Sequence, residues 1–162
     1  MIEKFMDLAI KEAEKAKAKD EVPIGAIIVK DGLVVAKAHN LIEKNQDATA
    51  HAEMLAIKKA SKKLKSWRLD GCEIFITLEP CPMCAGAIVN ARIERVYYGA
   101  KEPKSGSAES KFDILTNSGL NHKTEFLGGI KKEECESIIK KYFKEKRVEK
   151  ALTKKVNGGK IE

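Results

Sequence analysis

The stretch that decides the fold is Glu73–Tyr98, EIFITLEPCPMCAGAIVNARIERVYY. It opens with an apolar, β-branched run from residue 73 to 78, which is typical of a buried strand. Pro82 is suited to the first turn of a helix, because its missing N–H needs no partner there, so a helix is predicted from Pro82 to Asn90. A second strand follows at 95–98. The alternation predicts a sheet with helices packed on it.

Upstream of this stretch the sequence predicts a helix, a hairpin and a second helix. Apolar residues recur at helical spacing over residues 2–18. The short apolar runs at 26–29 and 33–36 flank Asp31-Gly32, a strong signal for a tight turn, so these two strands are expected to pair antiparallel. A polar loop is predicted at 40–47. A helix is predicted from Thr49 to Leu64, with the Thr49 hydroxyl as its cap.

Downstream the pattern predicts one more strand and a long helix. Residues 101–110 resemble a loop, and a short helical turn is expected at 112–115. A fifth strand is predicted at 124–127 and a helix at 131–150. The expected fold is therefore an α/β, three-layer α/β/α sandwich with a five-stranded mixed sheet and helices on both faces. Residues 1–150 are predicted to form one domain, followed by a basic, flexible tail at 151–162.

Composition limits the class of protein. The chain has 162 residues, of which 43% are hydrophobic and 34% charged, enough for one domain with a real core. No apolar run approaches the roughly 20 residues that cross a bilayer, and the N-terminus does not resemble a signal peptide. We therefore expect a cytoplasmic protein without a membrane partner. Four cysteines in a chain of this length do not form a disulfide framework.

Two short motifs carry the chemistry. His51 and Glu53 open one predicted helix, and Cys81 and Cys84 open the next. One imidazole and two thiolates make three zinc ligands, which leaves a fourth tetrahedral position for water, as in catalytic sites. Glu53 is then a proton shuttle rather than a ligand. Histidine-x-glutamate with proline-cysteine-x-x-cysteine is the known signature of zinc deaminases of nucleobases. The cofactor expected is one Zn²⁺ per subunit.

The net charge is uneven along the chain. Lys and Arg total 31 against 24 acidic residues, which gives +7. Residues 131–162 hold 11 basic and 6 acidic residues, so most of the excess lies there. Such a segment suggests a polyanionic partner such as nucleic acid, but composition alone favours a solvated, lysine-rich helix face.

Nearly the whole chain, from about residue 3 to 147, resembles the bacterial tRNA-specific adenosine deaminases of the cytidine/deoxycytidylate deaminase superfamily. The stretches that carry the resemblance are VPIGA at 22–26, DATAHAE at 47–53, WRL at 67–69, TLEPCPMCAGA at 77–87 and LNH at 120–122. The resemblance implies hydrolysis of adenosine to inosine at the wobble position of a tRNA anticodon, typically of an arginine tRNA. It also implies a homodimer whose two subunits share the anticodon stem-loop.

The same resemblance implies roles for individual residues. His51, Cys81 and Cys84 match the zinc ligands, and Glu53 matches the proton shuttle. The residues matched to substrate contacts are Asn40, the backbone of Ala52, Ile28 as a pocket wall, Lys101, Glu102, Lys104 and Ser105 beside the target, His122, and Tyr142, Phe143 and Arg147 in the final helix.

Three positions depart from the family pattern. Ala48 stands where proline is usual, Glu102 stands where aspartate is usual, and Tyr142 replaces the first of two phenylalanines. None of the three is a metal ligand, so the differences affect RNA recognition rather than the reaction. Cys72 and Cys135 fall outside the zinc spacing and are expected to be structural. Trp67 is expected in the core or a dimer interface.

Two other functions remain open at this level. The same zinc chemistry serves deaminases of free bases or nucleosides, such as guanine, cytosine or cytidine. A non-catalytic zinc module that binds RNA is the third possibility, although such a module has no use for Glu53. The basic C-terminal stretch, the loop at 101–106 and the Tyr142-Phe143 pair favour a macromolecular substrate, since phosphate contacts and stacking hold single-stranded RNA.

Overall fold

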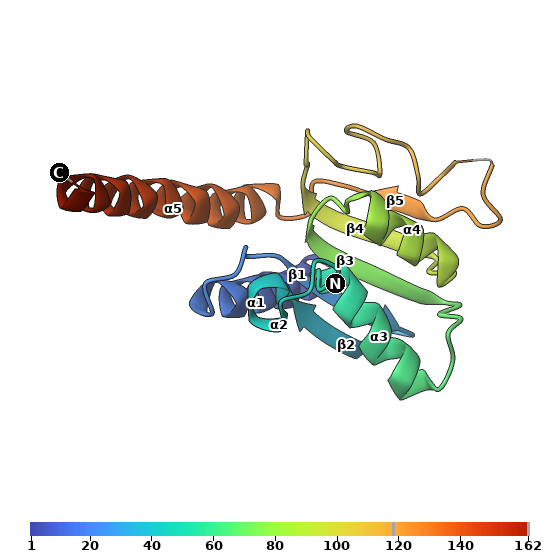
Figure 1. The fold of residues 1–162 in the computed structure, drawn as a ribbon. Helices are drawn as coiled ribbons and strands as arrows, with labels where there is room; N and C mark the ends of the chain where they lie inside the picture. The colour runs from blue at the N-terminus through green and yellow to red at the C-terminus, as the bar shows by residue number, and fades with distance from the viewer. Residues whose placement is uncertain (118, 162) are drawn as a thin grey trace.

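A computed structural model describes residues 1–117 and 119–161, without side chains from residue 157 on. A five-stranded mixed sheet with the strand order β2-β1-β3-β4-β5 lies at the centre (Figure 1). Helices α3 and α4 pack on one face of it, and α1 with the start of α5 packs on the other. The predicted three-layer α/β/α fold is confirmed.

The N-terminal half follows the sequence pattern closely. Helix α1 spans Ile2–Ala18 and strands β1 and β2 span Gly25–Lys30 and Leu33–His39. Asp31 and Gly32 both have positive φ, at 52° and 75°, as a tight hairpin turn between twisted strands requires. The two strands pair antiparallel, and β1 continues the sheet by pairing antiparallel with β3.

The strand, helix and strand of the deciding stretch form a parallel unit. Strand β3 spans Cys72–Leu78, helix α4 spans Pro82–Asn90 and strand β4 spans Arg95–Ala100, and β3 and β4 pair parallel. Strand β5, Glu125–Leu127, adds to β4 in parallel. The carboxyl ends of β3 and β4 therefore meet at one edge of the sheet, where ligand sites of α/β folds are usually built.

Five details differ from the sequence prediction. A short helix α2, Ile42–Asn45, lies within the predicted loop, because a distant carboxylate, that of Glu21, accepts the backbone N–H groups of Glu43 and Lys44. Helix α3, Ala52–Leu64, begins after His51. Thr49 does not cap it, since the Thr49 hydroxyl donates to Asp47 instead.

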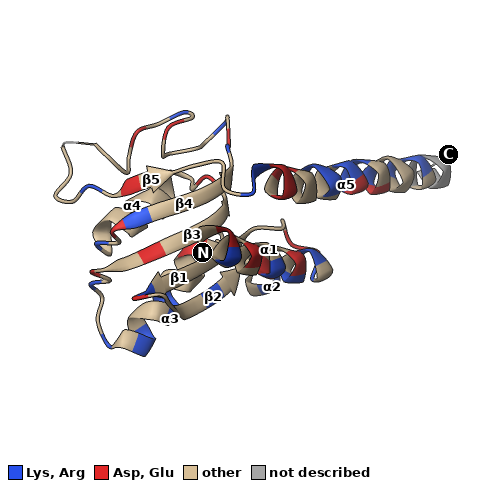
Figure 2. Cartoon of the chain, turned by 180° about the vertical axis from the view of Figure 1, so that it is seen from behind, with Lys and Arg blue, Asp and Glu red and all other residues tan. Residues whose placement is uncertain are grey.

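The other two differences concern the C-terminal third. No helical turn forms at 112–115, because the N–H groups of Phe112 and Ile114 donate back to the loop at 106–107. Helix α5, Lys132–Ile161, extends beyond the predicted end at residue 150 and projects from the body (Figure 1 and, from behind, Figure 2). Val148, Leu152 and the residue at 156 continue the four-residue spacing of a helix face. The flexibility predicted for 151–162 concerns, in part, residues outside those described.

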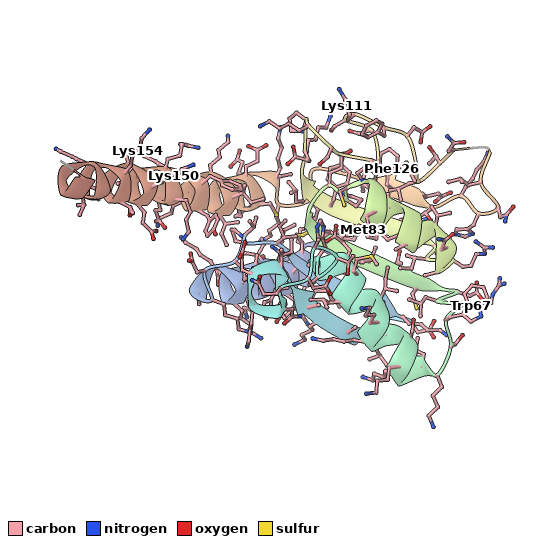
Figure 3. The ribbon with its side chains drawn as sticks, viewed as in Figure 1. Trp67, Met83, Lys111, Phe126, Lys150 and Lys154 are labelled. Atoms are coloured by element: carbon pink, nitrogen blue, oxygen red, sulfur yellow. The ribbon has the colours of Figure 1, made fainter. Side chains whose placement is uncertain are left out.

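The exposure of Cys72, Cys135 and Trp67 can be compared with what the sequence predicts for these residues. Cys72 and Cys135 are completely buried, as expected. Trp67 is 63% exposed, so it does not pack in the core; it lies in the loop between α3 and β3, beside the partly exposed end of α4 (Figure 3). Within the described residues, no helix combines the length and the apolar character that crossing a membrane requires.

Candidate active site

Two helices begin at one point, and each brings a possible metal ligand. His51 is the residue before α3 and Cys81 the residue before α4, and both have extended backbone there. Cys84 lies in the first turn of α4, next to Met83, which is labelled in Figure 3 near the start of α3. The Nδ1 atom of His51 lies 3.6 Å from the Cys81 sulfur and 3.5 Å from the Cys84 sulfur.

These separations fit a tetrahedral metal. Bonds of about 2.0–2.1 Å to nitrogen and about 2.3 Å to sulfur at the tetrahedral angle place the two ligand atoms about 3.6 Å apart. All three ligand atoms lie within 4.8 Å of one another. One imidazole and two sulfurs form a donor set that suits zinc. Among the described residues, this is the one such group of histidine, cysteine or acidic side chains.

The protonation of the ligands is coupled. A hydrogen bond with Cys84, helped by His51, lowers the pKa of Cys81 to about 4. The pKa of Cys84 is raised, because its thiol donates to Cys81 and is buried. The hydrogen bond with Cys81 also raises the pKa of His51. Binding of a metal cation by these three groups therefore releases protons.

Glu53 is the acidic group beside this cluster. It lies in the first turn of α3 and is only 4% exposed. Burial raises the pKa of its carboxyl to about 7. A carboxyl with this pKa can both accept and release a proton near neutral pH, which is the property of a general acid/base. The structure brings together all four residues that the sequence predicted for the chemistry.

Asn40 lies next to the site with an unused hydrogen-bonding atom. It follows directly after β2, is 3% exposed, and its backbone N–H donates to the Ile24 carbonyl. Its side-chain Oδ1 is buried and has no hydrogen-bond partner among the described residues. Such an orphaned polar atom needs an explanation, and a ligand is one. Ile28 and Ala52 are fully buried on the same face of the sheet.

Glu79 organises the loop that follows β4. Its carboxylate is 2% exposed and accepts five donors from this loop. They are the backbone N–H groups of Glu102, Ala108, Glu109 and Ser110, at 2.8–3.1 Å, and the Ser110 hydroxyl. Burial opposes ionisation, but these donors outweigh it and lower the pKa of Glu79.

Gly106 completes this arrangement. A Cβ atom at this position would lie 2.4 Å from the carboxyl group of Glu79, so only glycine lets the loop wrap around it.

The predicted RNA-contacting residues of this loop are held by the loop itself. The Lys101 ammonium pairs with Glu109 at 2.9 Å. The Glu102 carboxylate, one methylene longer than the usual aspartate, accepts the backbone N–H of Lys104 at 3.0 Å. The Ser105 carbonyl accepts the hydroxyl of a neighbouring serine. The Lys104 side chain is exposed.

The remaining predicted contacts are divided between two places. Tyr142 is only 8% exposed, and its hydroxyl donates to the Asp20 carbonyl at 3.4 Å, whereas Phe143 is 42% exposed and Arg147 is exposed. The two rings of the pair meet edge to face. His122 bonds the Ile93 carbonyl at the start of β4. This is the opposite end of the strand from the metal ligands, so the structure does not bring His122 to the site.

The sequence interpretation missed three buried carboxylates that shape the surroundings. Glu79 was read only as part of the cysteine motif. Glu21 holds α2, and Glu12 accepts the His39 Nδ1–H at 2.9 Å. A carboxylate in an apolar helix face, as for Glu12, or directly after a strand, as for Glu79, is a signal that could have found two of them, since buried charges need partners. Glu21 lies between α1 and β1 and carries no such signal.

Comparisons with known proteins agree with this geometry. The profile of the MafB19-like deaminase family matches residues 2–147. The tRNA-specific adenosine deaminase of Bacillus subtilis (strain 168) is 47% identical over 153 residues, which cover 94% of this chain and 95% of that protein.

Two solved structures are also similar. One comes from biochemical and structural studies of A-to-I editing by tRNA:A34 deaminases at the wobble position of transfer RNA. It has a TM-score of 0.80 and 44% identity, over 83% of this chain and 97% of that chain. A guanine deaminase from Bacillus subtilis has a TM-score of 0.60 and 41% identity, over 69% of this chain and 71% of that chain.

Proposed function

The chain belongs to the tRNA-specific adenosine deaminases within the MafB19-like deaminase family, and from this membership we propose that it hydrolyses adenosine to inosine at the wobble position of a tRNA anticodon, with an arginine tRNA as the expected substrate. The observation that carries the proposal is the buried carboxyl of Glu53 beside the three metal-binding side chains, together with the buried Asn40, whose Oδ1 has no hydrogen-bond partner among the described residues. Because the proposed substrate is a tRNA, we expect the reaction to take place in the cytoplasm.

We propose zinc as the metal, held by His51, Cys81 and Cys84. The donor set and the nitrogen–sulfur separations support this choice. When bound, zinc supplies Lewis-acid activation of water. The helix starts at His51 and Cys81 place the positive ends of two helix dipoles at the site, which complements the negative charge that thiolate ligands bring to it.

Glu53 carries the protons of the reaction. With its pKa near neutrality, its carboxylate accepts a proton from the attacking water and delivers it to N1 of the adenine ring. After the hydroxyl has added to C6, the carboxylate takes the remaining proton of that hydroxyl and passes it to the amino group; the C6–N bond then breaks, the C6 oxygen becomes a carbonyl and ammonia leaves. Burial keeps bulk water away from this carboxyl, so the proton passes to the substrate rather than to solvent. The net change is replacement of the amino group by oxygen.

The base is held by groups around Asn40. The free Oδ1 of Asn40 is an acceptor for a base edge, and the start of α3 at Ala52 offers a backbone contact; Ile28 is the predicted apolar wall. The loop at 101–106, anchored on Glu79, and the exposed Phe143 and Arg147 supply the RNA contacts. Flipped bases are read in this way, by edge hydrogen bonds and apolar stacking.

We also propose that the enzyme is a homodimer joined through α4. This helix carries no charged residue, yet Met83, Gly86 and Ala87 on its outer side are partly exposed. The exposed Trp67 and Leu120 border the end of the same helix. An uncharged helix face edged by a tryptophan is typical of a subunit interface. Sedimentation equilibrium tests this: the proposed mass is twice that of the chain.

Deamination of a free base is the second candidate, favoured by the similarity to the guanine deaminase. That similarity covers less of both chains than the match to the tRNA enzymes. The deciding experiment supplies the zinc-loaded protein with an arginine tRNA anticodon stem-loop, free adenosine, guanine and cytidine, and measures ammonia and inosine. We expect turnover of the stem-loop alone. Fast turnover of any free base or nucleoside would refute the tRNA assignment.

A further inference from the structure

We propose that a pocket between the end of α1, α2 and α5 binds a backbone phosphate of the substrate RNA beside the target nucleotide, with Lys19 and Lys44 as its contacts. The inference rests on the proposed function, since it assigns a second contact to the same RNA. The pocket has a volume of about 610 Å³ and is lined by Lys19, Asp20, Glu43, Lys44, Tyr142 and Lys146.

The lysines that line the pocket differ in whether they already have an ion pair. Lys146 is already engaged, with its ammonium on Asp20 and Glu149 and above the Tyr142 ring. Within the described part of the chain, neither Lys19 nor Lys44 has a carboxylate within ion-pair distance. The Lys19 ammonium contacts the His39 ring, but neither of the two positive charges is balanced by a carboxylate there, so both can attract an anion.

The carboxylates of the pocket do not cancel this. Asp20 is held by Lys146, which leaves Glu43 as the one lining carboxylate without an ion pair among the described residues. Two available cations against one carboxylate give a site that favours a single phosphate over a cation. A flexible lysine ammonium meets a phosphate as a point charge.

The pocket is connected to the base-binding region through the end of β2. The Lys19 ammonium lies 3.0 Å from Nε2 of His39, and His39 directly precedes Asn40. The segment then turns into α2, while the Leu41 N–H donates to the Ala50 carbonyl, next to the metal-binding histidine. An RNA whose base reaches Asn40 therefore carries its flanking phosphates past this segment, where backbone contacts set register.

Both walls of the pocket are formed before any ligand arrives. The Tyr142 hydroxyl ties α5 to the end of α1. On the other side, the buried Glu21 carboxylate holds the backbone of Glu43 and Lys44 at 2.7–3.0 Å. A preformed site does not spend binding energy on ordering its walls. This explains why Tyr142 is buried while its neighbour Phe143 is exposed.

The test compares Lys19→Met, Lys44→Met and the double variant with the wild type. Binding of a fluorescent anticodon stem-loop is measured by anisotropy at several salt concentrations, and deamination kinetics are measured alongside. We expect the double variant to bind roughly tenfold more weakly. The slope of log K against log salt should fall by about 0.7 for each lysine that contacts single-stranded RNA. The rise in KM should exceed any change in kcat.

Lys62→Met is the matched control. Lys62 lies on α3, is also exposed, and has no ion pair in the described part of the chain. Its substitution therefore removes one positive charge at a position outside the pocket. A double variant whose affinity and salt slope match those of Lys62→Met overturns the pocket while the deaminase assignment stands. A wild type that binds the stem-loop without producing inosine counts against the proposed function, and the anisotropy series still decides on the pocket.

Discussion

Glu79→Gln should destabilise the protein much more than a surface substitution of the same kind. In glutamine, one carboxylate oxygen becomes an NH₂ group. If the other oxygen keeps the N–H groups of 108–110, the NH₂ faces the N–H of Glu102, donor against donor. One charge-assisted hydrogen bond, about 1.5–3 kcal/mol, is lost, and the others weaken without the charge. We expect a loss of about 3–5 kcal/mol in the free energy of unfolding.

Urea unfolding of the two proteins measures this difference, with Glu109→Gln as the matched control. Glu109 pairs with Lys101 at the surface, and such an exposed pair contributes less than about 1 kcal/mol. Hydrogen exchange adds a local readout, because the amides of 102 and 108–110 should lose protection first. A Glu79→Gln midpoint equal to that of the control would show that the carboxylate does not hold the loop.

The predicted difference in stability between wild type and Glu79→Gln should also depend on pH, in a direction that follows from the pKa of Glu79. The folded-state pKa of Glu79 lies below its ordinary value, so its ionised form stabilises the fold above the unfolded pKa of about 4.3. This stabilisation is lost as the pH falls through the folded-state pKa. The difference in stability between wild type and Glu79→Gln should therefore be full at pH 7 and shrink in acid. A constant difference down to pH 3 would contradict the argument.

Three further predictions concern the site and its loop. Glu53→Ala should keep one zinc per chain by elemental analysis and lose turnover by a factor of about 10²–10⁴; loss of metal in this variant would mean that Glu53 is a ligand. Removal of the metal with a chelator should abolish deamination, and zinc should restore it better than magnesium, which prefers oxygen ligands; full activity in the chelated protein would exclude the metal role. Gly106→Ala should raise KM for the stem-loop and lower the unfolding midpoint, because the added Cβ meets the Glu79 carboxyl. Gly32→Ala has open space around it but a positive φ, so it should affect stability alone. A Gly106→Ala protein with wild-type KM would show that the loop does not take part in RNA recognition.

The sequence was sufficient where local chemistry decides the structure. Pro82 placed the start of α4 correctly, and Asp31-Gly32 placed the hairpin. The metal-binding group also followed from the spacing of residues within each motif, since each motif sits at the start of a helix. In the fold these two helix starts meet. Prediction of the family depended on resemblance, which the comparisons then supported.

Prediction failed where distant side chains satisfy the backbone. Helix α2 exists because Glu21, some twenty residues earlier in the chain, accepts its N–H groups, and no local pattern announces that contact. The loop at 101–110 is likewise ordered by Glu79 from another element. Thr49 has the right residue type for a cap, but the nearer Asp47 carboxylate takes its hydroxyl. Such competition between partners is decided only in three dimensions.

The two helix starts that meet at His51 and Cys81 have a consequence for how this enzyme can change. All three metal ligands and Glu53 come from these helices, whereas the loop on Glu79, the end of β2 and helix α5 surround them from separate parts of the chain. Substitutions in those surrounding parts can accumulate without disturbing the ligands. Substrate choice and reaction chemistry are thus separable by mutation, and laboratory selection for a new nucleotide context should find its first useful variants outside α3 and α4.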